Sequence, residues 1–364
     1  MIVRSFQQCC RLVAVLAVLI AATDALAGST IKTTEVPFRP DIRALGMGGA
    51  YLAAGRNANA FLYNPALLTQ SHVDIGLPIS IGVNQDTQKV FEFLSDNADS
   101  LQKFDELAPA DQDKIYQDMT AIDGLPINVR IAPMFNLAVR NFGLAAYGVV
   151  KAGVAVDKGI YEPRVSADGV LDVVVAMGFA KKASEKLAIG VNAKVINRRQ
   201  THFRVGVSKI GDTFDEVLDS LQVSKTGFAL DVGSLYSLGE RTRVGFVIQD
   251  LTGKVGDDKF PVNVKAGIAH TMWRNHLLLA GDVVDLLNKD GVSLFNRVYL
   301  GAEFRIPLIS IRGGFYQGYP SFGGGLNIKI IKLDYAYYQV ERGRFTGQDS
   351  QGQHEVQLKF GWGW

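Results

Sequence analysis

The sequence has only two cysteines, Cys9 and Cys10, and both lie near its start. Around them, basic residues accompany a short apolar run over residues 12–22 and a small-residue site at 25–27, which is typical of a secretory signal peptide. We therefore predict that residues 1–27 are removed. The mature chain would then contain no thiol, which excludes disulfides and cysteine-ligated metal sites.

Long hydrophobic runs and an excess of either charge are also missing. No apolar run is long enough to cross a bilayer as a helix. The 38 basic and 36 acidic residues nearly balance, and nothing suggests a nucleic-acid partner, which would need a basic stripe. The mean hydropathy is only slightly positive, as expected for a membrane barrel whose strands are polar on one face.

Signatures of catalysis are missing as well. The five histidines show no HExxH or paired-ligand spacing, although His270 and His276 flank one predicted turn. The glycines within 46–49 lack the lysine of a nucleotide-binding loop. A hydrolase would have to rely on His354 and Ser350, which lie at a predicted loop. We predict a protein that is not an enzyme and that binds no cofactor or metal.

What the sequence does contain is clearest at its C-terminus, where polarity alternates as in an extended strand. One face carries Val356, Leu358, Phe360, Trp362 and Trp364, and the other carries Glu355, Gln357, Lys359, Gly361 and Gly363. A strand with one face in lipid and the other in a wet lumen explains this pattern. We predict a transmembrane β-barrel closed by this strand, with outer-membrane lipid and the barrel-assembly machinery as partners.

The rest of the chain divides into strand-like runs, fourteen in all, an even number as expected for a bacterial barrel. They lie near residues 73–83, 126–139, 143–156, 168–181, 186–204, 225–238, 241–254, 260–272, 276–286, 294–306, 309–317, 320–330, 332–341 and 353–364. Long and short joints alternate between them, which is typical of outer loops and periplasmic turns. We predict an all-β, 14-stranded antiparallel barrel in the bacterial outer membrane, with both termini on the periplasmic side.

Alternation within single strands indicates which side chains face the lumen. Over 187–195, Asn192 and Lys194 would point inward, and over 297–306 Glu303 would do so, each between apolar residues that face lipid. Aromatic residues suit the membrane boundary, where the ring body meets lipid and the polar tip meets water. The predicted strands place all three tryptophans at the periplasmic boundary: Trp273, Trp362 and Trp364.

Small residues are dense from 43 to 68, which suits a compact plug whose backbone lies against the barrel wall. The pattern Arg-Ala-Leu-Gly-Met-Gly-Gly-Ala at 43–50, followed by Tyr-Asn-Pro-Ala at 63–66, resembles the N-terminal hatch of FadL-type outer-membrane barrels. Leu67 departs from that pattern, because many members carry glycine there. The resemblance implies a lead and hatch within residues 28–70. Its site residues would be Gly46, Gly48, Gly49, Asn64, Pro65 and Ala66.

Further stretches at 226–233, 300–304, 312–315 and 333–337 fit the same superfamily, which includes PorV-like and TraF-like barrels. Residues 71–364 would form the barrel. The resemblance implies passive transport of long-chain fatty acids or other hydrophobic solutes, with a hydrophobic ligand as partner. The alternative it implies is a non-conducting scaffold that assists a secretion or conjugation apparatus, with proteins of that apparatus as partners.

Residues 84–125 form the largest insertion, and their apolar residues recur at helical spacing on both sides of Pro109. Between Asp86 and Asp123 there are ten acidic and three basic residues. We predict a helical extracellular loop. It is either an acidic cap that gates or recognises something outside, or a helical pair that only packs over the barrel mouth.

Two prolines mark a candidate lateral opening. Pro78 and Pro133 each remove a ladder hydrogen bond from a predicted strand, so we expect a bulge or a gap in the wall. The neighbouring run 143–155, which contains Gly148 and Gly153, is apolar or small on both faces apart from one lysine. Either hydrophobic solutes leave the lumen sideways here, as the FadL resemblance implies, or this wall packs against the hatch and the prolines form ordinary bulges.

Overall fold

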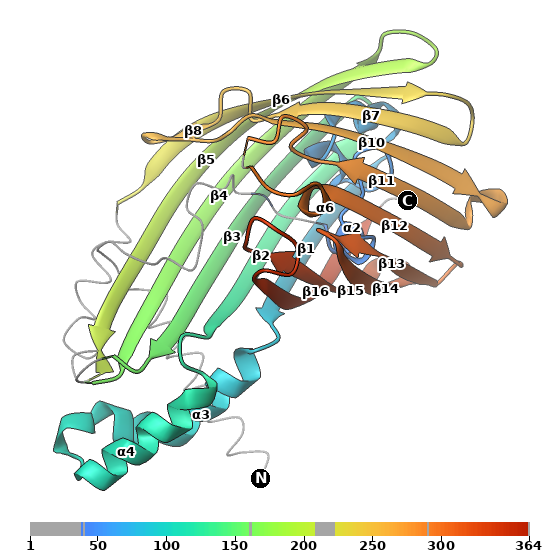
Figure 1. The fold of residues 1–364 in the computed structure, drawn as a ribbon. Coiled ribbons are helices and arrows are strands. Elements are labelled where there is room, and N and C mark those ends of the chain that lie inside the picture. The colour runs from blue at the N-terminus through green and yellow to red at the C-terminus, as the bar shows by residue number, and fades with distance from the viewer. Residues whose placement is uncertain (1–37, 39–40, 160–161, 208–222, 290, 363–364) are drawn as a thin grey trace.

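The computed structural model describes residues 38, 41–159, 162–207, 223–289 and 291–362. The predicted signal peptide, most of the predicted lead and Trp364 lie outside this part of the chain. Within it, the protein is a closed antiparallel β-barrel with a short helical segment at its N-terminus and helices in some connections (Figure 1). None of the described helices is both long and apolar enough to cross a membrane.

Fourteen strands form the wall in the described part of the chain, as the sequence predicts. They are β1 (Asp74–Asn84), β2 (Pro126–Val139), β3 (Phe142–Asp157), β4 (Arg164–Lys182), β5 (Leu187–Gly206), β6 (Lys225–Ser237), β7 (Thr242–Gln249), β10 (Asn263–Met272), β11 (Leu277–Val283), β12 (Val298–Arg305), β13 (Ile309–Tyr316), β14 (Tyr319–Ile328), β15 (Ile331–Glu341) and β16 (Ser350–Trp362). Each pairs with the next, and β1 pairs with β16, which closes the ring. The short strands β8 (Lys254–Val255) and β9 (Asp258–Lys259) form a hairpin beside β6.

Strand β16 is polar on its inner face and apolar on its outer face, also as predicted. In β16, Glu355, Gln357 and Lys359 are at most 6% exposed, whereas Val356 and Phe360 are 45% and 48% exposed. The same alternation runs through β5 and β12. An outward apolar face suits acyl chains, and inward charges find their partners in the enclosed lumen.

Long and short connections alternate around the ring. We call the end with the connections β2–β3, β4–β5 and β6–β7 the short-turn end, and the opposite end the long-loop end. The helix η6 (Trp273–Asn275) lies in a turn of the short-turn end, and α6 (Leu294–Arg297) lies in a loop of the long-loop end. Trp273 and Trp362 are both exposed at the short-turn end, as predicted. One connection at the long-loop end, between β13 and β14, has only two residues.

Strand length differs strongly around the ring. Strands β3, β4 and β5 have 16, 19 and 20 residues, whereas β11, β12 and β13 have 7, 8 and 8. At about 3.3 Å per residue, β5 spans about 66 Å and β11 about 23 Å. A tilted strand needs only about 9–11 residues to cross a bilayer core. The long strands therefore continue well past the short ones, as Figure 1 shows.

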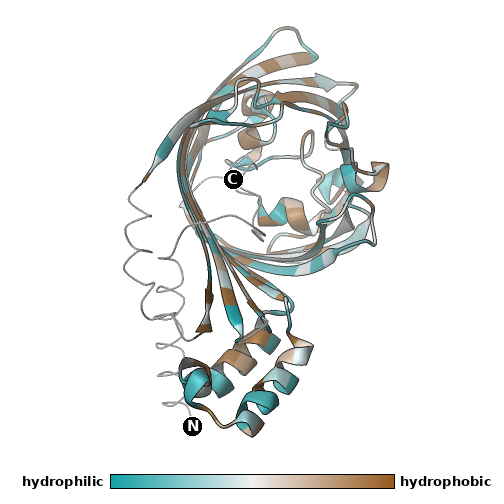
Figure 2. Ribbon diagram, turned by 60° about the vertical axis from the view of Figure 1, so that its left-hand side comes forward, coloured by the Kyte–Doolittle hydropathy of each residue, from teal (hydrophilic) through white to brown (hydrophobic). Residues whose placement is uncertain are grey.

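Helices occupy the largest insertion, as predicted: α3 (Thr87–Gln102), η3 (Phe104–Glu106), α4 (Pro109–Asp118) and η4 (Met119–Ala121). Their buried residues include Val90, Phe104 and Met119, which pack in one apolar cluster with Val156 and Phe203 of the long strands. Figure 2 shows the helical pair outside the ring of strands, not across its opening. The helices therefore cover the extension of the wall and leave the barrel mouth free.

The N-terminal segment, residues 41–70, fills the middle of the lumen. It contains α2 (Ile42–Gly46), η1 (Ala60–Leu62) and η2 (Pro65–Gln70), and most of its residues are buried. Side chains of Asp41 and Asn64 cap α2 and η2 by accepting backbone N–H bonds at 2.9 and 3.0 Å. Helices this short are not stable alone, so contacts with the wall must hold the segment in place.

Candidate functional site

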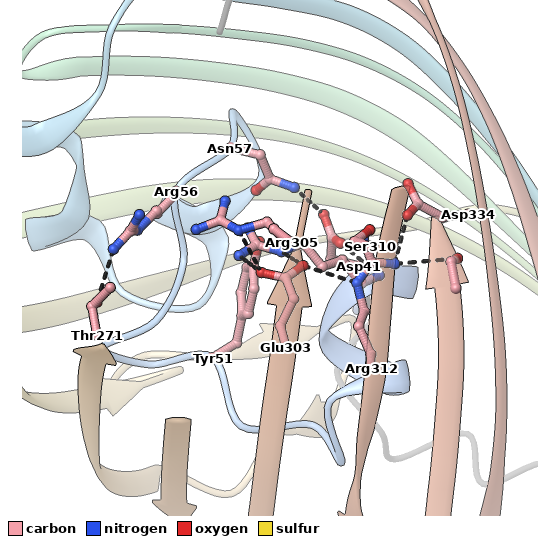
Figure 3. Close-up of polar contacts among 12 residues, drawn as sticks. Asp41, Tyr51, Arg56, Asn57, Thr271, Glu303, Arg305, Ser310, Arg312 and Asp334 are labelled. Carbon is pink, nitrogen blue, oxygen red and sulfur yellow. Dashed lines mark hydrogen bonds and ion pairs between the residues drawn. The ribbon is translucent and has the colours of Figure 1, made fainter. Parts of the chain in front are cut away.

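The first half of the N-terminal segment, residues 41–57, is held to the wall by a buried ion pair (Figure 3). Arg43 donates from Nε and Nη2 to the two carboxylate oxygens of Glu303 on β12, at 2.7 and 2.5 Å. Arg312 on β13 donates to Glu303 at 2.9 Å and to Asp334 at 2.6 Å. Glu303 is 0% exposed, so its charge depends on these partners.

Backbone groups of the first half also bind a wall carboxylate. The N–H groups of Tyr51 and Leu52 donate to Oδ2 of Asp282 on β11, at 2.5 and 2.9 Å. Within the segment, the side-chain amide of Asn57 donates to Asp41 at 2.6 Å. These directional bonds fix the first half against β11 and β12.

The three predicted hatch glycines allow the first half to approach the wall closely. A Cβ atom on Gly46 would lie 3.1 Å from Cα of Gly323, and one on Gly48 would lie 2.6 Å from a backbone oxygen of β13. A Cβ atom on Gly49 would lie 2.7 Å from the ring of Tyr299. Gly48 and Gly49 also have φ angles of 64° and 83°. Glycine is needed at both positions for space and for backbone conformation.

The second half, residues 58–70, carries the predicted hatch residues Asn64, Pro65 and Ala66. Besides capping η2, Asn64 donates to the backbone oxygen of Ser234 on β6 at 3.0 Å. Pro65 lies so close to β5 that a Cβ atom on Gly190 would be 2.6 Å from it. The structure therefore brings all six predicted hatch residues into the lumen. The three glycines lie against strands β12 to β14, and Asn64, Pro65 and Ala66 lie against β5 and β6.

Apolar contacts dominate the second half. Phe61, Leu62 and Leu68 are at most 3% exposed and join one cluster with the inner faces of β2 to β6. Neutral hydrogen bonds accompany these contacts. Asn192 on β5 donates to the backbone oxygen of Phe61 at 2.7 Å, and Gln249 on β7 donates to that of Leu62 at 3.1 Å. Leu67, the departure from the family pattern, is 2% exposed and packs in the adjoining cluster of this segment.

The N-terminal segment separates two cavities of the lumen. The long-loop cavity has a volume of about 1150 Å³ and is lined by residues such as Arg130, Lys151 and Asp285. The short-turn cavity has a volume of about 1050 Å³ and is lined by residues such as Arg56 and Arg305. Both carry many charged side chains, and the apolar surface inside the barrel lies at the segment and the wall beside it.

The β-ladder is interrupted at two adjoining places in the β1–β3 wall. Regular β1–β2 pairing passes over Leu77 and Pro78, and regular β2–β3 pairing passes over Ala132 and Pro133. The register is the same on both sides of each break. The prolines therefore interrupt the ladder without a bulge, and we call this interruption the gap. In contrast, β13 pairs with β12 and β14 without a break.

The structure brings some of the predicted opening residues together. Gly148 lies opposite Pro133, and a Cβ atom on Gly148 would be 3.7 Å from the proline ring. Pro78 is buried on the neighbouring strand β1. Gly153 pairs with Asp168 farther along β3, where the ladder is intact. Pro78, Pro133 and Gly148 therefore mark the gap, and Gly153 lies beside the wall extension.

The two histidines that flank one turn bind other groups. The Nδ1 of His270 lies 2.8 Å from the hydroxyl of Thr242, and the Nδ1 of His276 lies 2.7 Å from the backbone oxygen of Arg305. Among the described residues there is no group of three or more potential metal ligands.

Sequence reasoning found the glycines and Asn64 of the segment but missed Arg43 and Asp282, which hold it. The sequence does indicate that charged residues such as Glu303 point inward. It does not indicate which charges form ion pairs, because Arg43 and Glu303 are 260 residues apart in the chain.

A closed barrel of fourteen strands around an N-terminal segment is the fold of several solved hydrocarbon channels. A "TodX monoaromatic hydrocarbon channel deltaS2 mutant" is 13% identical with a TM-score of 0.55, and the match covers 89% of this chain and 98% of that one. The P. putida toluene transporter TodX is 13% identical with a TM-score of 0.51, and the match covers 89% of this chain and 98% of that one. The Ralstonia pickettii toluene transporter TbuX is 15% identical with a TM-score of 0.51, and the match covers 88% of this chain and 97% of that one. At these identities, the likeness establishes the fold.

Within that fold class, the chain belongs to the family described as "F plasmid transfer operon, TraF, protein", whose sequence model matches residues 61–260. No curated protein matches the chain.

Proposed function

We propose that this barrel lies in the bacterial outer membrane and passes hydrophobic solutes, such as long-chain fatty acids, sideways into the membrane without catalysis. The observation that carries the proposal is the gap in the β1–β3 wall. Neighbouring strands part most easily where the regular ladder between them is interrupted. The inner face beside the gap is apolar, with Met134, Tyr147 and Val149 all buried there.

The proposed route begins at the long-loop end, which would face the outside of the cell. A solute would enter the long-loop cavity, whose lining includes Val129 of β2 and Ala152 of β3, a few residues from the gap. The N-terminal segment would act as the hatch that keeps the solute from the short-turn end. The helical insertion would then be an extracellular loop, and residues 1–27 a cleaved signal peptide.

A tryptophan at the gap tests this route. Gly148→Trp should fill the outer side of the gap and abolish uptake of labelled fatty acid into liposomes that contain the barrel. The matched control is Gly313→Trp, because a Cβ atom on Gly313 has similar room, 3.9 Å from its nearest neighbour, in a continuous ladder. Both variants should keep heat-modifiable mobility on gels. Normal uptake by folded Gly148→Trp would refute the lateral route.

The alternative function is a non-conducting scaffold for a secretion or conjugation apparatus. The family description and the helical pair on the wall extension favour it. A pull-down of envelope proteins with the intact protein and with a variant in which a short linker replaces residues 87–121 distinguishes the two functions. Loss of specific partners together with unchanged, negligible uptake would support the scaffold.

A further inference from the structure

Positive charge exceeds negative charge in the short-turn cavity. Nine basic and five acidic residues line it. Three of the acids are used within the protein, because Glu303 is shared by three arginines, Asp334 binds one of these, and Asp74 binds a lysine at 2.8 Å. The other two, Glu185 and Glu240, lie exposed in turns. The remaining arginines of the cavity are therefore short of counter-charge.

Two of these arginines, Arg56 and Arg243, form no ion pair with any described residue. Arg56 belongs to the N-terminal segment and donates from Nη2 to the hydroxyl of Thr271 on β10, at 3.0 Å (Figure 3). Arg243 on β7 donates from Nη1 to the side chain of Gln70. Its Nη2 is buried and has no hydrogen-bond partner in the part of the chain that the structure describes. Neutral groups thus orient both guanidinium groups without balancing their charge.

The arginines of this cavity also repel one another. The lumen walls partly desolvate Arg56 and lower the pKa of its guanidinium, and the nearby charges of Arg243 and Arg43 lower it further. Arg305 on β12 lies 3.2 Å from Glu303, which it shares with two other arginines, and the charge of Arg56 acts on it as well. A bound anion would attract each of these guanidinium groups and offset the repulsion between them.

We propose that Arg56, Arg243 and Arg305 bind a small oxyanion, phosphate or carboxylate, in the short-turn cavity. Guanidinium groups present planar forks of N–H donors that match the oxygen atoms of either anion. The anion bridges the N-terminal segment to β7 and β12. The site lies across the segment from the long-loop cavity, so it goes beyond the proposed function and does not depend on solute transport.

Equilibrium dialysis of the folded full-length barrel in detergent tests the site. Inorganic phosphate and succinate are used as separate probes at constant ionic strength and neutral pH. Saturable binding of at least one probe is expected, and the preferred probe shows which oxyanion the site takes. Loss of one charged hydrogen-bond donor in Arg243→Gln or Arg56→Gln should weaken binding about 10- to 100-fold.

The matched control is Arg140→Gln, which removes an exposed arginine from a turn at the same end of the barrel, outside the cavity lining. It should bind like the unmodified protein. Absence of saturable binding by the unmodified barrel would overturn the proposal, and so would equal weakening in Arg140→Gln. If Arg243→Gln fails to fold, Arg56→Gln decides the question, because its change lies in the segment and leaves the wall intact.

Discussion

The two halves of the N-terminal segment are attached to the barrel by different physical means. The first half is held by the buried Arg43–Glu303 ion pair and by backbone hydrogen bonds to Asp282. The second half forms neutral hydrogen bonds with Asn192 and Gln249, and its Phe61 and Leu68 pack on a wall lined largely by alanine and other apolar residues. Loss of one member of a buried ion pair leaves the other charge unpaired, whereas apolar contacts tolerate small shifts.

The two parts of the wall that contact these halves also differ, in the continuity of their β-ladder. The ladder is continuous where the ion pair attaches, at β12, and interrupted beside the apolar contacts, at Pro78 and Pro133. The charged attachment and the interrupted ladder therefore lie on different sides of the barrel. The following variants test whether these two sides act independently.

The largest effect is expected from Glu303→Gln. The neutral amide leaves Arg43 buried without its carboxylate, which costs about 3–5 kcal/mol. Hydrogen–deuterium exchange should rise strongly in residues 41–57 and much less in 58–70. Glu240→Gln, which removes an exposed turn carboxylate, should change neither half. Equal rises in both halves would show that the two attachments are not independent.

A somewhat smaller effect, in the other half, is expected from Leu68→Ala. Truncation of this 1% exposed side chain should cost about 2–5 kcal/mol through lost burial and a cavity. Hydrogen–deuterium exchange should now rise chiefly in residues 58–70. Leu308→Ala is the comparison variant, because Leu308 is 59% exposed in a short turn. An increase confined to 41–57 would contradict this account of the second half.

The smallest effect is expected from Pro133→Val, which returns a backbone N–H group to β2. One regained hydrogen bond should stabilise the barrel by about 0.5–1.5 kcal/mol and raise its unfolding midpoint in urea. Fatty-acid uptake should fall, because the gap narrows. Pro320→Val provides the reference, since Pro320 already lies in a paired part of β13–β14. Faster uptake by Pro133→Val would count against the gap as the exit.

Much of the fold could be predicted because its signals are local. The predicted run 126–139 coincides with β2, and most other strand boundaries agree within a few residues. The run predicted at 241–254 ends earlier, as β7 at Gln249, because a loop and the β8–β9 hairpin follow it. Of the bulge or gap expected at Pro133, the structure has an interrupted ladder without a bulge, since the register holds on both sides of the break. A proline in the sequence shows that a backbone N–H group is missing. The sequence does not show whether the two neighbouring strands then form a bulge or keep their register.

The sequence by itself determined the barrel and the direction of each side chain, because alternation along a strand requires no knowledge of distant residues. It also placed glycine where the segment approaches the wall. Only the tertiary structure decided which charges meet, such as Arg43 with Glu303, and which arginines have no carboxylate partner among the described residues. These pairings depend on how the closed ring brings residues hundreds of positions apart to the same level of the lumen, and no local pattern contains that information.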